Sequence, residues 1–162
     1  MQRDIMLKPI GYVKVGMPVD SSVRWNRWSE ISVIEISDEY VEGLKGLEEF
    51  SHIFVIYFMH RAAWRPEDII LKPRRREDLP EVGVFAFRGR NRPNPIGLAV
   101  CEVAEIKYNL LKVRGLDAYP DSPILDLKPY DYYDIVKNPR VPSWFLKLWE
   151  EGGEARPMWV GP

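Results

Sequence analysis

Cationic side chains and prolines dominate the stretch from Arg88 to Leu98, which reads RGRNRPNPIGL. Arg88, Arg90 and Arg92 occupy alternate positions, and alternate side chains of an extended strand project to one face. The two prolines lack a backbone N–H group and bias the residues before them toward extended geometry. The stretch is therefore predicted to be a rigid loop that displays cations to an anionic ligand. A proline-rich connection with solvated arginines is the alternative.

A second set of chemically useful side chains follows residue 123. Asp126, Lys128 and Tyr130 alternate along the run 124–130, so a strand would place them on one face together with Ile124. A carboxylate or phenolate in such a row can accept a proton directly or through water. The alternative is a surface ion pair beside an aromatic ring, which contributes little to stability.

Apolar runs with strand-like composition predict the elements that position these side chains. The predicted strands cover 9–16, 31–36, 53–59, 82–87, 98–106, 110–114 and 124–130. The run 53–59 is almost continuously apolar and is predicted to be buried on both faces. A short helix is expected from Ser143, a suitable N-cap, to Glu151. Its stripe of Trp144, Phe145, Leu148 and Trp149 predicts packing on the barrel or on a partner subunit.

Composition limits the class of protein. The chain has 162 residues, a net charge of −1 and no long apolar segment, so we expect one soluble domain without a membrane span or a secretory signal. This charge excludes a generally basic nucleic-acid binder, and any RNA site must be a local patch. The single cysteine, Cys101, lies in a strand-like run and is expected to be buried, and a reducing cytoplasm is the expected compartment. Two histidines and one cysteine without close spacing predict no metal site.

Four segments in order, FSHIFVIYF, GVFAFR, RPNPIGL and RGLDAYPDSPILDLKPY, closely resemble the TsaA-like or TrmO-type family. The resemblance implies an all-β fold, a single-sheet β-barrel with irregular connections over 1–130, followed by a C-terminal extension over 131–162 that carries the short helix. It implies S-adenosylmethionine as cofactor and methylation of N6 of threonylcarbamoyl-adenosine beside the tRNA anticodon. It also implies a homodimer with the cofactor near the interface. A non-catalytic module that binds S-adenosylmethionine or RNA is the alternative function.

The resemblance also assigns site residues. The implied cofactor contacts are His60, Arg61, Arg88, Leu98, Asp121, Ser122, Pro123 and Ile124. The implied catalytic row is Asp126 as base, with Lys128 or Tyr130 orienting the substrate. Candidates for RNA contact are Arg74, Arg75, Arg90, Arg92 and Asn94. His52, by contrast, is expected to bond the backbone near a strand start.

The chain departs from the family pattern in three places. It lacks the Pro-Arg-Gln tripeptide that contributes to the cofactor site, and 24–27 is the candidate replacement. Relatives carry D-G-T-P where this chain has Pro120-Asp121-Ser122-Pro123, so we expect similar hydrogen bonding from a different backbone. Asn91 stands where many relatives have histidine or an aromatic residue, which leaves open a changed substrate preference.

Overall fold

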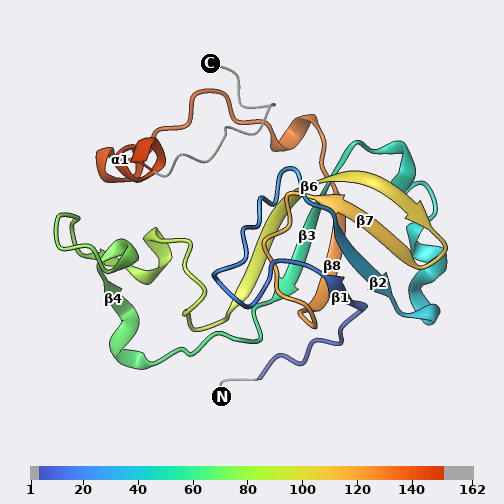
Figure 1. The fold of residues 1–162 in the computed structure, drawn as a ribbon, viewed down its shortest axis with the longest axis horizontal. Helices are drawn as coiled ribbons and strands as arrows, with labels where there is room; N and C mark the ends of the chain where they lie inside the picture. Colours follow the sequence, from blue (N-terminus) through green and yellow to red (C-terminus); the bar gives the residue numbers. More distant parts are fainter. Residues whose placement is uncertain (1–3, 152–162) are drawn as a thin grey trace.

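The computed structural model describes residues 4–151, which form a closed antiparallel β-barrel and a smaller lobe beside it (Figure 1). The barrel strands are β1 (Gly11–Val15), β2 (Ser32–Ile36), β3 (His52–Phe58), β6 (Ile96–Lys107), β7 (Leu110–Arg114) and β8 (Pro123–Pro129). Their order around the barrel is β1-β2-β7-β6-β3-β8, and β1 also pairs with β8. Closure leaves these strands without a free edge. The predicted single-sheet barrel is confirmed.

Short 3-10 helices join the strands. They are η1 (Asp38–Leu44), η2 (Leu47–Glu49), η3 (Pro66–Ile69), η4 (Pro73–Arg75), η5 (Val84–Ala86) and η6 (Tyr132–Asp134). The α-helix α1 covers Ser143–Glu151, as predicted. No helix within residues 4–151 is long and apolar enough to cross a membrane.

The barrel interior is filled by every second residue of the strands. Ile53 and Val55 of β3 are 0% exposed and Tyr57 is 5% exposed. The residues between them lie on the outer surface, where Phe58 is 38% exposed. The prediction that 53–59 is buried on both faces is therefore wrong, because the outer face is only partly covered: Phe54 and Ile56 are partly exposed and Phe58 is exposed.

A β-bulge changes the face that β8 presents. Adjacent residues of β3, Ile56 and Tyr57, pair with Asp126 and Ile124, so β8 contains an extra residue at this point. Ile124 is 0% exposed in the core, whereas Asp126 lies on the outer surface. The prediction that Ile124 shares a face with Asp126 is wrong, because the bulge inverts the alternation.

One end of the barrel, here called the mouth, gathers the loop 88–95, the residues after β3 and the segment 115–122. Two contacts join them: Met59 N, after β3, donates to Pro95 O of the loop at 2.7 Å, and His60 Nδ1 lies 3.2 Å from Ser122 Oγ. The chain after β2 runs into η1 at the opposite end, where Leu44 is 6% exposed and joins the core. Sequence-distant segments thus meet at the mouth.

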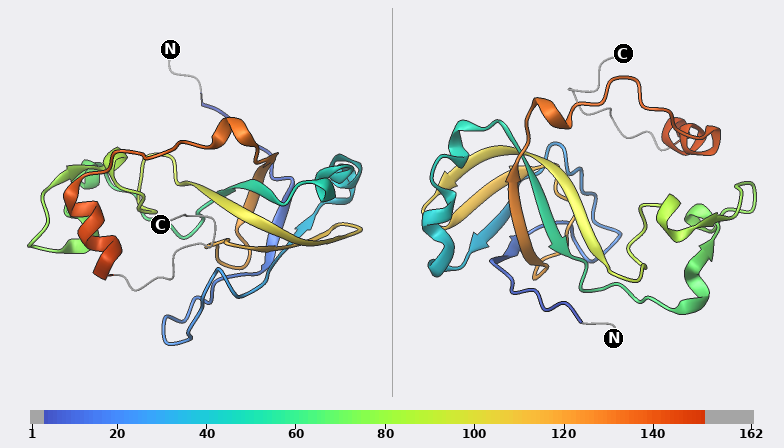
Figure 2. Two further views of the ribbon diagram at one scale, coloured as in Figure 1. Left: turned by 90° about the horizontal axis from the view of Figure 1, so that it is seen from above. Right: turned by 180° about the vertical axis from the view of Figure 1, so that it is seen from behind.

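The side lobe comprises residues 64–87 and α1, and Figures 1 and 2 show it beside the barrel. It contains the two-stranded sheet of β4 (Ile70–Leu71) and β5 (Val82–Gly83). The predicted strand 82–87 is wrong beyond Gly83, because the chain turns there into η5 and buries Val84 to 1% exposure. Lys147 of α1 pairs with Asp78 of the lobe at 2.6 Å.

Candidate functional site

His60 and Ser122 meet at the mouth. His60 follows β3, Ser122 precedes β8, and His60 Nδ1 lies 3.2 Å from Ser122 Oγ. Ser122 is 1% exposed, whereas His60 faces solvent. The contact joins two segments to which the resemblance assigned the same ligand.

The turn before β8 keeps a conformation that glycine favours. Ser122 N donates to Tyr119 O at 3.2 Å, Pro120 follows Tyr119, and Asp121 has a φ of 66°. A proline followed by a residue with positive φ is the pattern of a type II turn. Aspartate tolerates this region better than most residues. Asp121 thus adopts the left-handed backbone without a glycine, and the expected difference from the backbone of relatives stays a prediction.

Arg61 and Arg90 converge on Tyr119. The Arg61 guanidinium lies 5.6 Å from the centre of the Tyr119 ring, and Arg90 Nη1 donates to Tyr119 Oη at 3.3 Å. Both arginines are exposed, and neither has a carboxylate partner within residues 4–151. Sequence reasoning assigned Arg61 to the cofactor and Arg90 to RNA, and it missed Tyr119. The only signal for Tyr119 was its place in the turn-rich segment before Ser122.

The three arginines of the loop 88–95 do not share a face. Arg88 Nη2 donates to Leu98 O at 3.0 Å, while Arg92 Nη1 donates to Phe87 O at 3.1 Å and to Gly89 O at 3.3 Å. The prediction from strand geometry is wrong, because residues 88–95 contain bends and no strand residue. Arg92 therefore braces the loop from within.

Side-chain and backbone hydrogen bonds fasten this loop to the chain after β3. Asn91 Oδ1 accepts from Ala63 N at 3.0 Å, so the residue that departs from the family pattern has a structural contact. Asn94 uses its backbone carbonyl for Ile96 N at 2.7 Å, and its side chain is exposed.

Solvent exposure differs among Leu98, Pro123 and Ile124. Leu98 is 49% exposed on the outside of β6, and Pro123 is half-buried at the start of β8. The side chain of Ile124 lies in the core, and its carbonyl accepts from Ile10 N at 2.8 Å. The bulge turns the side chain of Ile124 inward, and the cofactor contact of Ile124 stays a prediction.

The residues of the predicted catalytic row lie along the outside of β8 and directly after it. Lys128 Nζ is 2.8 Å from Asp126 Oδ2, and Asp126 Oδ1 accepts from Leu127 N at 2.9 Å. Tyr130 packs edge-to-face on Phe54 at 5.3 Å, and its N–H donates to His52 O at 3.1 Å. Since His52 begins β3, Tyr130 lies toward the end opposite the mouth. Asp126 and Lys128 are thus brought together, and Tyr130 stands apart from His60.

A polar group that the sequence did not indicate lies just inside the mouth. Tyr57 Oη donates to Asp117 Oδ1 at 2.8 Å, and Arg27 Nη1 pairs with Asp117 Oδ2 at 2.7 Å. Burial, followed by the charge of Asp117, raises the pKa of the Tyr57 phenol, which therefore stays protonated as a donor. The Tyr57 ring occupies the space where a Cβ on Gly97 would lie.

The two arginines of the candidate replacement segment, residues 24–27, have different surroundings. The Arg27 guanidinium stacks 4.5 Å from the centre of the Trp28 ring and faces Asp117, so its charge is engaged within the protein. Arg24 is exposed and has no ion pair in the described part of the chain.

Arg74 and Arg75 occupy a strained turn in the side lobe. Their φ angles are 53° and 56°, and Arg76 N donates to Pro73 O at 3.1 Å, the pattern of a type I′ turn. Glycine and asparagine prefer such positions, and the left-handed conformation costs other residues about 1–2 kcal/mol each. Neighbouring cations are paired, Lys72 with Glu77 and Arg76 with Asp78. Arg74 and Arg75 are exposed and have no acidic partner between residues 4 and 151.

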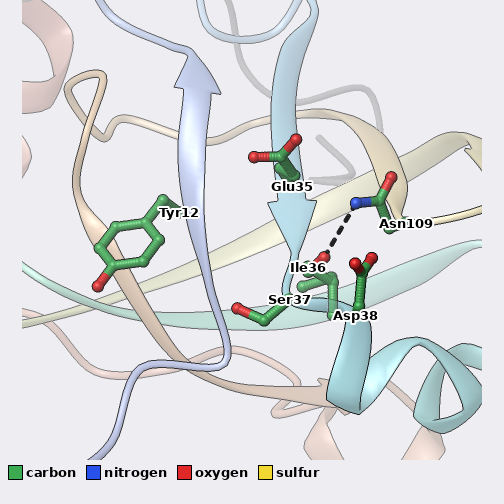
Figure 3. A pocket seen from close by; sticks show the side chains of 6 residues that line it. All are labelled: Tyr12, Glu35, Ile36, Ser37, Asp38 and Asn109. Carbon is green, nitrogen blue, oxygen red and sulfur yellow. Dashed lines mark hydrogen bonds between the residues drawn. The ribbon is translucent and has the colours of Figure 1, made fainter.

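A hollow away from the mouth contains none of the predicted residues (Figure 3). Its lining is Tyr12, Glu35, Ile36, Ser37, Asp38 and Asn109. Asn109 Nδ2 donates to Ile36 O at 3.2 Å, and Glu35 pairs with Lys14 at 2.8 Å. The predicted residues form an open surface rather than this hollow.

His52 and Cys101 have structural surroundings. His52 Nδ1 lies 2.9 Å from Ser51 Oγ, and the backbone carbonyl of His52 accepts from Tyr130 N at 3.1 Å, so the expected bond from the His52 ring to the backbone stays a prediction. Cys101 is 0% exposed as predicted, and burial raises the pKa of its thiol. Among residues 4–151, no group of three or more histidine, cysteine or acidic side chains is arranged to hold a metal ion.

Residues 12–135 match the family model of the tRNA-methyltransferase O N-terminal domain. An S-adenosyl-L-methionine-binding protein of Archaeoglobus fulgidus is 44% identical over 78% of this chain and 89% of its own length. The tRNA (adenine(37)-N6)-methyltransferase of Escherichia coli is 35% identical over 55% of this chain and 40% of its own. The crystal structure of TrmO from Pseudomonas aeruginosa superposes with a TM-score of 0.70 at 25% identity, covering 89% of this chain and 63% of that one. The chain therefore belongs to the TsaA-like, or TrmO-type, family.

Proposed function

We propose that this protein is an S-adenosylmethionine-dependent tRNA methyltransferase of the cytoplasm that methylates N6 of threonylcarbamoyl-adenosine beside the anticodon. The observation that carries the proposal is the convergence of His60, Ser122, Arg61 and Arg90 at the mouth, from three separate segments of the chain. The names of the E. coli relative and of the Archaeoglobus relative support the reaction and the cofactor respectively.

The donors at the mouth suit the cofactor. A methionyl carboxylate requires cations or N–H groups, and Arg88 is exposed and bonded only to a carbonyl group among the described residues. Leu98 offers an exposed apolar surface to the adenine ring, and the His60–Ser122 pair offers hydrogen bonds. When bound there, S-adenosylmethionine would supply an electrophilic methyl group.

Methylation of N6 also requires a base, because the nitrogen must lose its proton as the new N–C bond forms and the S–C bond breaks. We assign this role to the carboxylate of Asp126, whose ion pair with Lys128 keeps it oriented. Asp126 lies on the outside of β8, about 13 Å along the strand from Ser122 at about 3.3 Å per residue. The acceptor nucleoside would therefore lie over the beginning of β8.

A homodimer would enclose this open surface. Three apolar residues, Phe58, Ile96 and Leu98, are 38%, 42% and 49% exposed, and β3 pairs with β6 so that Phe58 faces Ile96. Adjacent exposed apolar groups of this kind favour a protein interface. A partner subunit on this face would exclude water from the mouth and from the outer side of β8.

RNA would approach the surface that carries exposed arginines in the side lobe and at the mouth. Arg74 and Arg75 in the side lobe and Arg90 at the mouth are exposed cations without acidic partners among the described residues. Phosphate contacts by Arg74 and Arg75 would position RNA without reading its sequence, and such contacts weaken as salt rises. Asn94 is a further candidate for RNA contact, whereas the bonds of Arg92 within the loop favour a bracing role.

The deciding experiment measures transfer of an isotopically labelled methyl group to tRNA with and without the threonylcarbamoyl modification, followed by nucleoside analysis. Label in N6-methylated threonylcarbamoyl-adenosine, and only with modified tRNA, is the expected result. An absence of transfer while labelled cofactor still binds would favour a binding module instead. The name of the Archaeoglobus relative, a binding protein, is the observation that supports that second candidate.

A further inference from the structure

We propose that Arg61, Arg90 and Tyr119 form a cradle for the carboxylate of the acceptor's threonyl group, an inference that rests on the proposed function. The two guanidinium groups belong to segments far apart in sequence, yet both contact Tyr119. Tyr119 therefore holds two like charges near one another, an arrangement that an anionic ligand stabilises.

The acidic side chains nearest the cradle in sequence do not neutralise its two arginines. Asp117, two residues before Tyr119, is already bonded to Arg27 and Tyr57. Asp121, two residues after Tyr119, makes no ion pair with either cradle arginine. Guanidinium groups match carboxylates in planar, two-pronged geometry, which makes them selective for this group.

The position of the cradle favours the acceptor over the cofactor. Arg61 and Arg90 are exposed at the rim of the mouth, whereas Ser122 is 1% exposed beneath it. A nucleoside that is part of a large RNA reaches the rim first. Tyr119 acts as a positioning residue, because its ring and hydroxyl fix both guanidinium groups before the ligand arrives.

The test compares two anticodon stem-loop RNAs, one with the threonylcarbamoyl group and one whose threonyl carboxylate is replaced by a carboxamide. Arg61→Gln and Arg90→Gln are each expected to lower kcat/KM for the carboxylate RNA by about 10- to 100-fold, the range expected for loss of a charge-assisted hydrogen bond. The carboxamide RNA should change by less than about threefold. Tyr119→Phe should reduce the preference for the carboxylate RNA to a smaller extent. Arg65→Gln is the matched control, since Arg65 is exposed but faces Glu67 and Asp68.

The comparison of kcat/KM on the two RNAs and two measurements of binding affinity separate this proposal from its alternatives. Equal losses on both RNAs would overturn it and assign the arginines to phosphates or to folding. A matching loss of affinity for S-adenosylmethionine, with decarboxylated S-adenosylmethionine unaffected, would overturn it in favour of the cofactor's carboxylate. RNA affinity is also measured with S-adenosylhomocysteine present, without turnover. If the wild-type protein methylates neither RNA, the proposed function fails, while the difference in affinity between the two RNAs still tests the cradle.

Discussion

The hydroxyl of Tyr57 donates a 2.8 Å hydrogen bond to Asp117, a residue that lies 60 positions later in the chain. The same carboxylate pairs with Arg27, 90 positions before it. Three segments that surround the mouth are therefore fastened to one acidic side chain. His60 follows Tyr57 closely and Ser122 follows Asp117 closely, so the fastening also fixes the separation of two proposed cofactor contacts.

Tyr57→Phe removes this hydrogen bond and keeps the ring. Because Asp117 is partly exposed and can recruit water, we expect the free energy of unfolding to fall by only about 1 kcal/mol. Urea denaturation measures this change. Tyr12→Phe is the control, since Tyr12 is 44% exposed and its hydroxyl has no hydrogen-bond partner among residues 4–151. An unchanged midpoint for Tyr57→Phe would contradict a stabilising role for the bond.

Gly97→Ala tests the close approach of β6 to the Tyr57 ring. A Cβ at Gly97 would overlap ring atoms of Tyr57, and overpacking of this kind costs about 1–3 kcal/mol. Thermal and urea unfolding are expected to show that loss. Gly43→Ala is the matched control, because a Cβ there meets no atom within 4 Å. Equal stability of the two variants would show that the ring moves aside without cost.

Asp126→Asn tests the proposed base. The amide keeps the shape of the carboxylate and cannot accept the N6 proton, so methyl transfer should be abolished while the Kd for S-adenosylmethionine stays within about twofold. Single-turnover assays and equilibrium dialysis measure the two quantities. Glu102→Gln, which alters another acid paired on the barrel surface, should leave both unchanged. Turnover of Asp126→Asn at the wild-type rate would remove Asp126 from the mechanism.

Acid should loosen α1 from the side lobe. Hydrogen bonds from Arg76 and then Lys147 lower the pKa of Asp78 below its ordinary value of 3.8. A carboxylate whose pKa is lowered in the folded state stabilises the docked form when the pH is above the ordinary pKa. That contribution disappears as the pH falls through the lowered pKa. Protection factors for the amides of 143–151 should therefore fall below about pH 3.8.

Asp78→Asn should produce the same loss of protection already at neutral pH, because it removes the charge that both Arg76 and Lys147 contact. Glu67→Gln serves as the control, since its ion pair with Arg65 does not involve α1. Hydrogen exchange followed by mass spectrometry resolves the helix peptide from the rest of the chain. Full protection in Asp78→Asn would show that the remaining contacts, the Arg76–Glu151 ion pair and the apolar packing around Leu148, which is 5% exposed, are sufficient to hold α1.

Local sequence patterns predicted most of the barrel, because alternation along β2, β6 and β7 matches burial on one face. These patterns failed where contacts between distant segments determine the local structure. The bulge that turns Ile124 inward arises from pairing with β3, and the bend after Gly83 arises from burial of Val84. Motifs placed His60 and Ser122 in one site, and the structure brings them into contact. No local sequence pattern could predict that Arg61 and Arg90 both contact Tyr119, because the three residues come from different segments.

The turn at Arg74 and Arg75 carries a consequence for protein engineering. Asn-Gly is the sequence that best accommodates a type I′ turn, so any selection guided by thermal stability alone will favour replacing both arginines. Such a variant would fold more readily and, under the proposed function, hold its RNA less tightly. Under the proposed function, thermal stability and RNA affinity therefore favour different residues at these two positions.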